Sequence, residues 1–251
     1  YNINMNISKI VILIILLVIL ICLKKPRIEH FDNELYWDEV YLLNIPRLEK
    51  RKNYMLKEFK KHGLNSKIHY GVDKKDIDGE YLEKLKNEGK ITQKYLNESL
   101  NKKQGTLACL LTHVGLWEKL KKSDKNHFLI FEDDCHIRPG FKEKARKYLK
   151  DVPSDWDMIW LGHGRLKGEK INKNVLVPEN NPGFALNALH HCYMIKKTSV
   201  DKFLNFLYPL NVRSSKDNII RKNFDKFNAY FIIDSLANQD RKVFSVSERE
   251  K

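Results

Sequence analysis

The sequence predicts an α/β fold in which strands and helices alternate along one globular domain. Three observations lead to this prediction: short apolar runs of strand length, amphipathic segments of helical period between them, and polar residues directly after several of the runs. Such alternation is typical of a sheet with mostly parallel strands. Ligands bind to these sheets at the carboxyl ends of the strands.

The elements follow in order from these patterns. The apolar run at residues 40–45 predicts the first strand, residues 47–62 a helix and residues 68–72 a second strand. Residues 106–121 form the clearest helix, because leucines, Val114 and Trp117 recur there at helical spacing. Further strands are predicted at residues 128–131, 158–161, 193–195 and 229–233, and further helices at residues 141–149 and 200–208.

The N-terminal part differs from the rest of the chain. Residues 10–23 form an unbroken apolar run between cationic flanks, and no small-residue cleavage site follows it. A full membrane span needs about 20 residues, so the run is short. We expect an uncleaved membrane anchor or signal-anchor, which makes the protein single-pass, with residues 1–9 as a flank, 24–36 as a tether and 37–251 as the domain. The strict charge rule places the flank with Lys24, Lys25 and Arg27, and so the domain, in the cytosol, but one extra cationic flank leaves the side of the membrane open.

The net charge is +14, from 46 basic and 32 acidic residues. The basic residues are interleaved with acidic ones, and no basic block carries interleaved aromatic residues, so we expect no nucleic-acid partner. A local basic pocket for a phosphate-bearing small molecule stays open. Cys109, Cys135 and Cys192 lack the spacing of a metal site and are interpreted as small core residues.

Three consecutive carboxylates, Glu132, Asp133 and Asp134, directly follow the strand predicted at residues 128–131. Adjacent like charges repel, and a divalent cation is a natural compensator. Strand alternation places Glu132 and Asp134 on one face, as metal ligands, and Asp133 on the other. The alternative is a solvated acidic turn.

Asn44, Arg47 and Arg51 follow the first predicted strand. Asn can hydrogen-bond a base or ribose and Arg can bind phosphate, although a solvated helix N-terminus is the alternative. His113 lies next to the apolar face of its helix, where it could also be a core histidine. Asp217 precedes a late helix and could also be a neighbour of its N-cap.

The order of these segments resembles glycosyltransferase family 25, which includes bacterial lipopolysaccharide galactosyltransferases and procollagen galactosyltransferases. Residues 42–51 are similar to the family's opening I-N-L-x-R-x-x-x-R, and residues 105–117 to G-x-x-x-C-x-x-S-H-x-x-x-W. Residues 128–134 are similar to its L-I-L-E-D-D strand, and residues 156–162 to W-D-x-x-x-L-G. Pro46 and Thr112 depart from these patterns, and Asp217 lacks the Pro-Val-Asp context of the family's late acid.

The resemblance implies a GT-A-type fold, Rossmann-like, and a metal-dependent, inverting transfer of a sugar. It implies a nucleotide-sugar donor, most often UDP-galactose in this family, and Mn²⁺ or Mg²⁺ held by Glu132 and Asp134. The acceptor is a hydroxyl on a glycan, a lipid-linked glycan or a hydroxylysine-type protein. The residues assigned to the donor are Asn44, Arg47, Arg51, His113 and Asp133, and the catalytic base is Asp217, with His191 as its substitute and His190 as a further candidate.

Two alternatives stay open at this point. One is a non-catalytic, membrane-tethered relative of the same fold. The other is a metal-dependent phosphohydrolase that uses the same carboxylates.

Overall fold

The computed structural model describes residues 37–183 and 185–239. The apolar run at residues 10–23 lies outside these residues, together with its flank and tether, so the anchor stays a prediction. Within the described residues, no helix combines the length and the hydropathy that a membrane crossing needs.

A mixed sheet forms the centre of the domain, with the strand order β2-β1-β3-β8-β5-β9-β7-β6. Strand β1 is parallel to β2 and β3, and β5 is parallel to β9. Two short strands attach to this path, since β10 pairs with β4 and β5. The strands are β1 (Glu39–Asn44), β2 (Ser66–Tyr70), β3 (His127–Glu132), β4 (Cys135–Ile137), β5 (Met158–Gly162), β6 (Gly168–Lys170), β7 (Val175–Pro178), β8 (Cys192–Lys196), β9 (Ala229–Ile232) and β10 (Ala237–Gln239).

Strand β8 is antiparallel to its neighbours β3 and β5. The chain enters β8 beside the end of β3, where the Glu132 amide donates to the His191 carbonyl over 2.9 Å. A reversed central strand therefore brings residues 189–191 to the carboxyl ends of the parallel strands. The expected mostly parallel sheet is thus interrupted by β8 beside the candidate site, and again at one edge, where β7 is antiparallel to β9 and β6 is antiparallel to β7.

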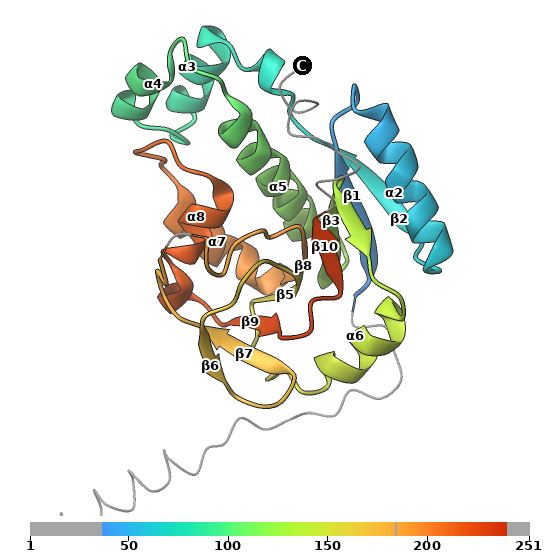
Figure 1. Cartoon of the computed structure of the whole chain (residues 1–251). Coiled ribbons are helices and arrows are strands. Elements are labelled where there is room, and N and C mark those ends of the chain that lie inside the picture. The colour runs from blue at the N-terminus through green and yellow to red at the C-terminus, as the bar shows by residue number, and fades with distance from the viewer. Residues whose placement is uncertain (1–36, 184, 240–251) are drawn as a thin grey trace, which may run out of the picture.

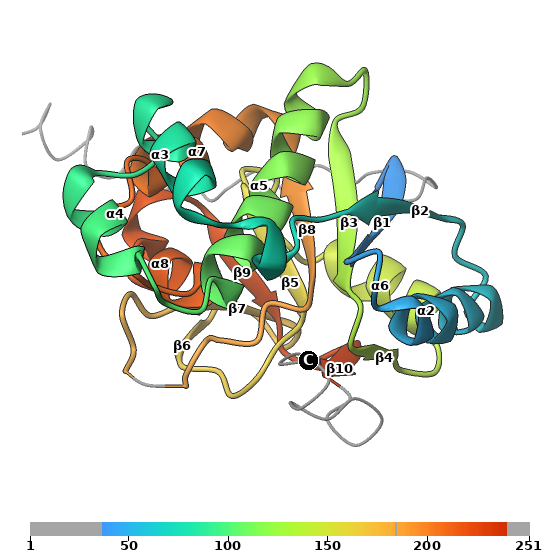
Figure 2. The ribbon, with the colours of Figure 1, turned by 90° about the horizontal axis from the view of Figure 1, so that it is seen from above.

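Helices cover both faces of the sheet (Figures 1 and 2). On β3, Phe128 and Ile130 belong to one apolar core, and Leu129 and Phe131 to the other, as strand alternation requires. The second core includes residues of α2 (Glu49–Lys61) and α6 (Phe141–Leu149). The first core includes residues of α3 (Gly79–Asn87), α4 (Gln93–Ser99), α5 (Gly105–Lys122), α7 (Val200–Leu207) and α8 (Lys216–Arg221).

Short 3-10 helices complete the described elements, at Lys74–Asp76, Lys197–Ser199 and Phe224–Lys226. Every strand and helix predicted from the sequence is confirmed, with ends within about two residues. The helix predicted from residue 47 begins at Glu49, because Pro46 and Arg47 form a turn after β1. Sequence patterns did not predict α3, α4, β4, β6, β7 or β10, and the late helix expected after Asp217 is α8, which includes Asp217 in its first turn.

Candidate functional site

A cavity of about 510 Å³ lies at the carboxyl ends of β1 and β3, beside the N-terminal half of α5. This is the sheet edge at which ligands were expected. Five acidic and four basic side chains line the cavity, so its formal charge is nearly balanced. They are Asp73, Glu132, Asp133, Asp134 and Asp217, and Arg47, Arg51, Lys74 and Lys216.

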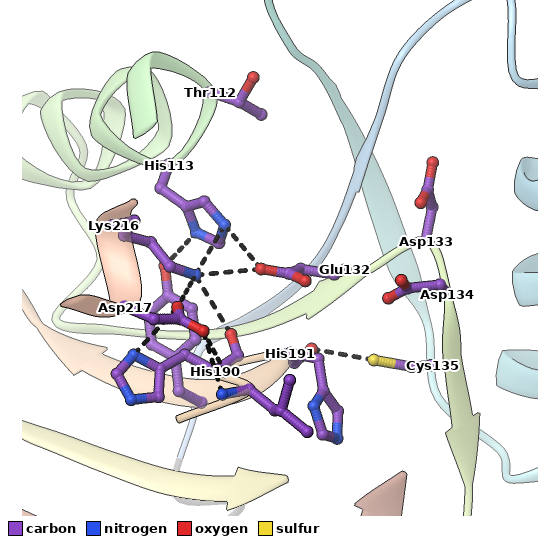
Figure 3. Close-up of polar contacts among 12 residues, drawn as sticks. Thr112, His113, Glu132, Asp133, Asp134, Cys135, His190, His191, Lys216 and Asp217 are labelled. Atoms are coloured by element: carbon purple, nitrogen blue, oxygen red, sulfur yellow. Dashed lines mark hydrogen bonds and ion pairs between the residues drawn. The ribbon is translucent and has the colours of Figure 1, made fainter. Parts of the chain in front are cut away.

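The three consecutive carboxylates take different partners in the protein. Glu132 ends β3, and Asp133 and Asp134 form the turn before β4. In Figure 3, Glu132 and Asp134 point to the same side and Asp133 points away. Asp134 is 2% exposed, and its Oδ2 accepts a hydrogen bond of 2.8 Å from Nε2 of Gln239.

Glu132 forms an ion pair with a buried lysine, Lys216. Nζ of Lys216 lies 3.0 Å from Oε1 of Glu132, and Nε2 of His113 lies 3.0 Å from the same oxygen. Although burial disfavours the carboxylate, the Lys216 ammonium holds the pKa of Glu132 well below its usual value. Burial also disfavours the ammonium, but Glu132 and Asp217 raise the pKa of Lys216. Glu132 and Lys216 are therefore both ionised at neutral pH.

His113 is held from both sides of its ring. Its Nδ1 lies 2.7 Å from the hydroxyl of Tyr193, which also accepts a hydrogen bond of 2.8 Å from Nε1 of Trp117. Burial, together with the nearby Lys216 charge, lowers the pKa of His113 to about 4. His113 is thus a neutral histidine that packs in the core and presents Nε2 to the cavity. It is therefore both a core histidine and a residue of the candidate site, the two roles considered for it from the sequence.

Asp133 is held by two of the residues assigned to the donor. Its Oδ1 accepts a hydrogen bond of 2.9 Å from Nη1 of Arg51, and its Oδ2 one of 2.9 Å from Nδ2 of Asn44. Arg51 and Asn44 are both buried. Burial outweighs these contacts and raises the pKa of Asp133. Arg51 and Asn44 therefore position the acidic turn as well as lining the cavity.

Arg47 is the more accessible arginine of the cavity, with 28% of its side chain exposed. Its guanidinium forms an ion pair with Asp73, which follows β2. Although burial acts in the opposite direction, Arg47 keeps the pKa of Asp73 below its usual value. The sequence grouped Arg47 with Arg51, and the structure separates an exposed arginine from a buried one.

Asp217 lies in the first turn of α8 and binds the chain that enters β8. Its Oδ2 accepts hydrogen bonds from the amides of Leu189 and His190, over 3.0 and 3.3 Å. Its Oδ1 lies 3.2 Å from Nδ1 of His190 and 3.5 Å from Nζ of Lys216. Burial disfavours its charge, but His190 and Lys216 lower the pKa of Asp217.

Asp217 lies beside Glu132, because the Lys216 ammonium contacts both carboxylates (Figure 3). The other two candidates for the base do not line the cavity. His191 is 1% exposed, and its Nε2 donates to the carbonyl of Ala237 over 2.9 Å. His190 is equally buried, and its Nε2 lies 2.9 Å from the carbonyl of Asn187.

Sequence reasoning missed Lys216, Gln239 and Cys109 as residues of the cavity. Cys135 and Cys192 are buried as expected, but Cys109 is exposed, because the start of α5 faces the cavity. A signal for Lys216 was present: it is the first residue of α8, where a cation is unfavourable to the helix dipole. A lysine at that position needs a separate partner, and Glu132 supplies it.

Comparison with known proteins decides the family. The family model described as "Glycosyltransferase family 25 (LPS biosynthesis protein)" matches residues 37–220. The chain belongs to glycosyltransferase family 25. This match covers β1 to α8, and so includes both ends of the Glu132–Lys216 contact.

Curated members of family 25 share about a quarter of their residues with the matched part of this chain. "Procollagen galactosyltransferase 1" of Danio rerio is 28% identical over 148 residues, which are 57% of this chain and 24% of that protein. A "Glycosyltransferase 25 family member" of Aedes aegypti is 26% identical over 181 residues, which are 68% of this chain and 29% of that protein. The chain thus spans a quarter to a third of the length of these relatives.

Family 25 also contains relatives that are named as inactive. "Inactive glycosyltransferase 25 family member 3" of Homo sapiens is 24% identical over 143 residues, which are 55% of this chain and 24% of that protein. Membership of family 25 therefore sets the reaction class to be tested, and the residues of the cavity have to support the activity itself.

Proposed function

We propose that the protein transfers a sugar from a nucleotide-sugar donor to a hydroxyl acceptor. The observation that carries this proposal is the cavity at the carboxyl ends of β1 and β3, in a member of glycosyltransferase family 25. The cavity combines cations that can bind a diphosphate with carboxylates that can bind hydroxyls or a metal. UDP-galactose is the proposed donor, and a glycan, a lipid-linked glycan or a hydroxylysine-type protein is the proposed acceptor.

A divalent cation fits the charge of this cavity. The cavity has one more acidic than basic side chain, and a donor diphosphate adds further negative charge. Mn²⁺ or Mg²⁺ is commonly held by one or two carboxylates and the phosphates of the substrate. Of the two predicted ligands, Glu132 has Lys216 on its Oε1, so Asp134 is the principal ligand in this proposal. There the cation would stabilise the charge that develops on the leaving diphosphate.

The protein's own side chains have separate tasks in this proposal. Arg47 lies at the exposed side of the cavity and binds the donor phosphates. Arg51 and Asn44 hold Asp133, which is then positioned to accept hydrogen bonds from the ribose or the sugar. Inversion in a single displacement needs a base within hydrogen-bond reach of the acceptor hydroxyl. Asp217 is the proposed base, since it is ionised and its carboxylate lines the cavity.

A panel of nucleotide sugars with Mn²⁺ tests this function, with nucleotide release and sugar transfer measured separately. We expect nucleotide release from one donor, a UDP-sugar, and transfer when an acceptor hydroxyl is added. Asp134→Asn should abolish both, because Asn keeps an acceptor for Gln239 but lacks the charge. Release of inorganic phosphate without transfer would instead identify a phosphohydrolase.

A non-catalytic relative is the second candidate. The inactive relatives favour it, as does the fact that Glu132 and Asp133 are already paired with basic side chains of the protein. It predicts a folded protein that binds a nucleotide but neither hydrolyses nor transfers any donor of the panel.

A further inference from the structure

Three groups on α5 and β3 form a cluster of metal-binding type beside the acidic turn. Cys109 and His113 lie one helical turn apart on α5, and Glu132 ends β3. Each offers one ligand atom, and these three atoms all lie within 4.8 Å of one another. A thiolate, an imidazole and a carboxylate at such separations are a donor set that Zn²⁺ or Co²⁺ accepts.

A side chain of the protein already contacts two of the three ligand atoms of this cluster. Nζ of Lys216 lies 2.9 Å from Nε2 of His113 and 3.0 Å from Oε1 of Glu132. It also donates to the carbonyl of His190 over 3.3 Å. These three acceptors match the three N–H donors of an ammonium. Lys216 is 2% exposed, so water does not compete for these contacts.

The surrounding groups fix the ammonium in this place. When Lys216 donates to Nε2 of His113, the proton of that neutral ring lies on Nδ1 and points at the Tyr193 hydroxyl, 2.7 Å away. Asp217, at 3.5 Å from Nζ, adds a second carboxylate. The ammonium thus has a complete set of partners from α5, β3, α8 and the segment before β8, as the dashed contacts in Figure 3 show.

We propose that Lys216 is a built-in cation at Glu132, seated where Cys109, His113 and Glu132 would otherwise bind a metal ion. Two cations cannot share Oε1 of Glu132 at these distances, because they would repel one another in a site with little water. Glu132 is then a positioning residue that binds α8 to β3, and it does not ligate a metal. The statement that Glu132 does not bind the donor's cation rests on the proposed function. The position of Lys216 at the cluster does not, because it needs no donor.

The test is a Co²⁺ titration, because a thiolate that binds Co²⁺ gives a charge-transfer absorption that an all-oxygen site lacks. The variants are Lys216→Met, which keeps similar bulk without charge, and Lys216→Met with Cys109→Ser. We expect no charge-transfer band in the wild-type protein, a band that saturates at one Co²⁺ in Lys216→Met, and its loss in the double variant. A saturating band in the wild-type protein would overturn the proposal, as would a folded Lys216→Met that shows none.

A second measurement on variants that keep Lys216 covers the case in which Lys216→Met does not fold. Mn²⁺ affinity is measured in the presence of UDP for Glu132→Gln and Asp134→Asn. We expect Glu132→Gln to change this affinity by less than about twofold and Asp134→Asn to weaken it by at least about tenfold. An equal loss in both variants would make Glu132 a metal ligand and contradict the proposal. If the wild-type protein binds no Mn²⁺ with UDP, the cation of the proposed function fails, whereas the Co²⁺ result still decides the role of Lys216.

Discussion

The ammonium of Lys216 lies 3.0 Å from Oε1 of Glu132, and this contact joins the first turn of α8 to the last residue of β3 across 84 positions of the chain. Lys216 is buried, and about a quarter of the Glu132 side chain is exposed to the cavity. The contact therefore affects both the stability of the domain and the charge of the site.

Replacing one partner of this ion pair should destabilise the protein more than replacing both partners. Lys216→Met leaves Glu132 without its cation, and loss of one partner of a buried pair costs about 3 kcal/mol. Lys216→Met combined with Glu132→Gln should recover a large part of that loss, since no unpaired charge remains. Urea unfolding of the two single variants and the double variant measures the coupling. Additive losses would mean that the two side chains do not interact.

The two arginines after β1 should differ in their effects. Arg47→Ala is expected to weaken donor binding by at least about tenfold, since a charge-assisted hydrogen bond is worth about 1.5–3 kcal/mol. Arg51→Met should instead lower the midpoint of urea unfolding, because it leaves Asp133 without its buried partner. Lys50→Ala, an exposed position on the same helix, is the control for both. Equal effects of Arg47→Ala and Lys50→Ala on donor affinity would remove Arg47 from the site.

The variant Asp217→Asn distinguishes whether Asp217 acts as the catalytic base or only as a structural carboxylate. As a base, Asp217 is worth about two to four orders of magnitude in turnover, with donor affinity unchanged. Because the pKa of Asp217 is lowered, turnover of the wild-type protein should show no loss from this group between pH 7 and pH 5. If turnover persists in the variant while unfolding becomes easier, Asp217 only holds the amides of Leu189 and His190.

Stability should fall as the pH is lowered from 6.5 to 4. Burial lowers the pKa of His113 and of His190 to about 4, whereas the unfolded chain takes up these protons near pH 6.5. The unfolded state thus binds more protons in this window, and the free energy of unfolding decreases by up to about 3 kcal/mol for each histidine. Glu132 and Asp217 act in the same direction but below this window, because their pKa values are lowered from about 4.

Urea unfolding at pH 7, 6 and 5 measures this dependence. A free energy of unfolding that is constant between pH 7 and pH 5 would contradict the neutral, buried state of His113 and His190.

The elements that sequence patterns predict are those with a continuous apolar run. Strand β3 and helix α5 are examples, because most of their own residues are buried. Strands β4 and β10 have three residues each and form by pairing with one another across about 100 positions, so neither has a local signal. Strand β6 is wholly exposed and depends on its pairing with β7.

The position of the site could be predicted from the sequence, but its contacts could not. Three carboxylates after a buried strand indicate a functional edge, and the cavity lies there. Their partners Arg51, Lys216 and Gln239 come from α2, α8 and β10, which are distant from the carboxylates in the sequence. Sequence reasoning therefore considered a divalent cation as the compensating charge and missed the lysine.

Binding of the donor in the cavity is the central claim, and calorimetric titration with UDP-galactose and Mn²⁺ tests it most directly. Thr106 is exposed at the start of α5 and lines the cavity, and Lys122 is exposed at the other end of the same helix. Thr106→Trp should fill the cavity and weaken donor binding by at least about tenfold, whereas Lys122→Trp should bind like the wild-type protein. Equal affinity of all three proteins, or no binding of any nucleotide sugar of the panel by the folded wild-type protein, would contradict the claim.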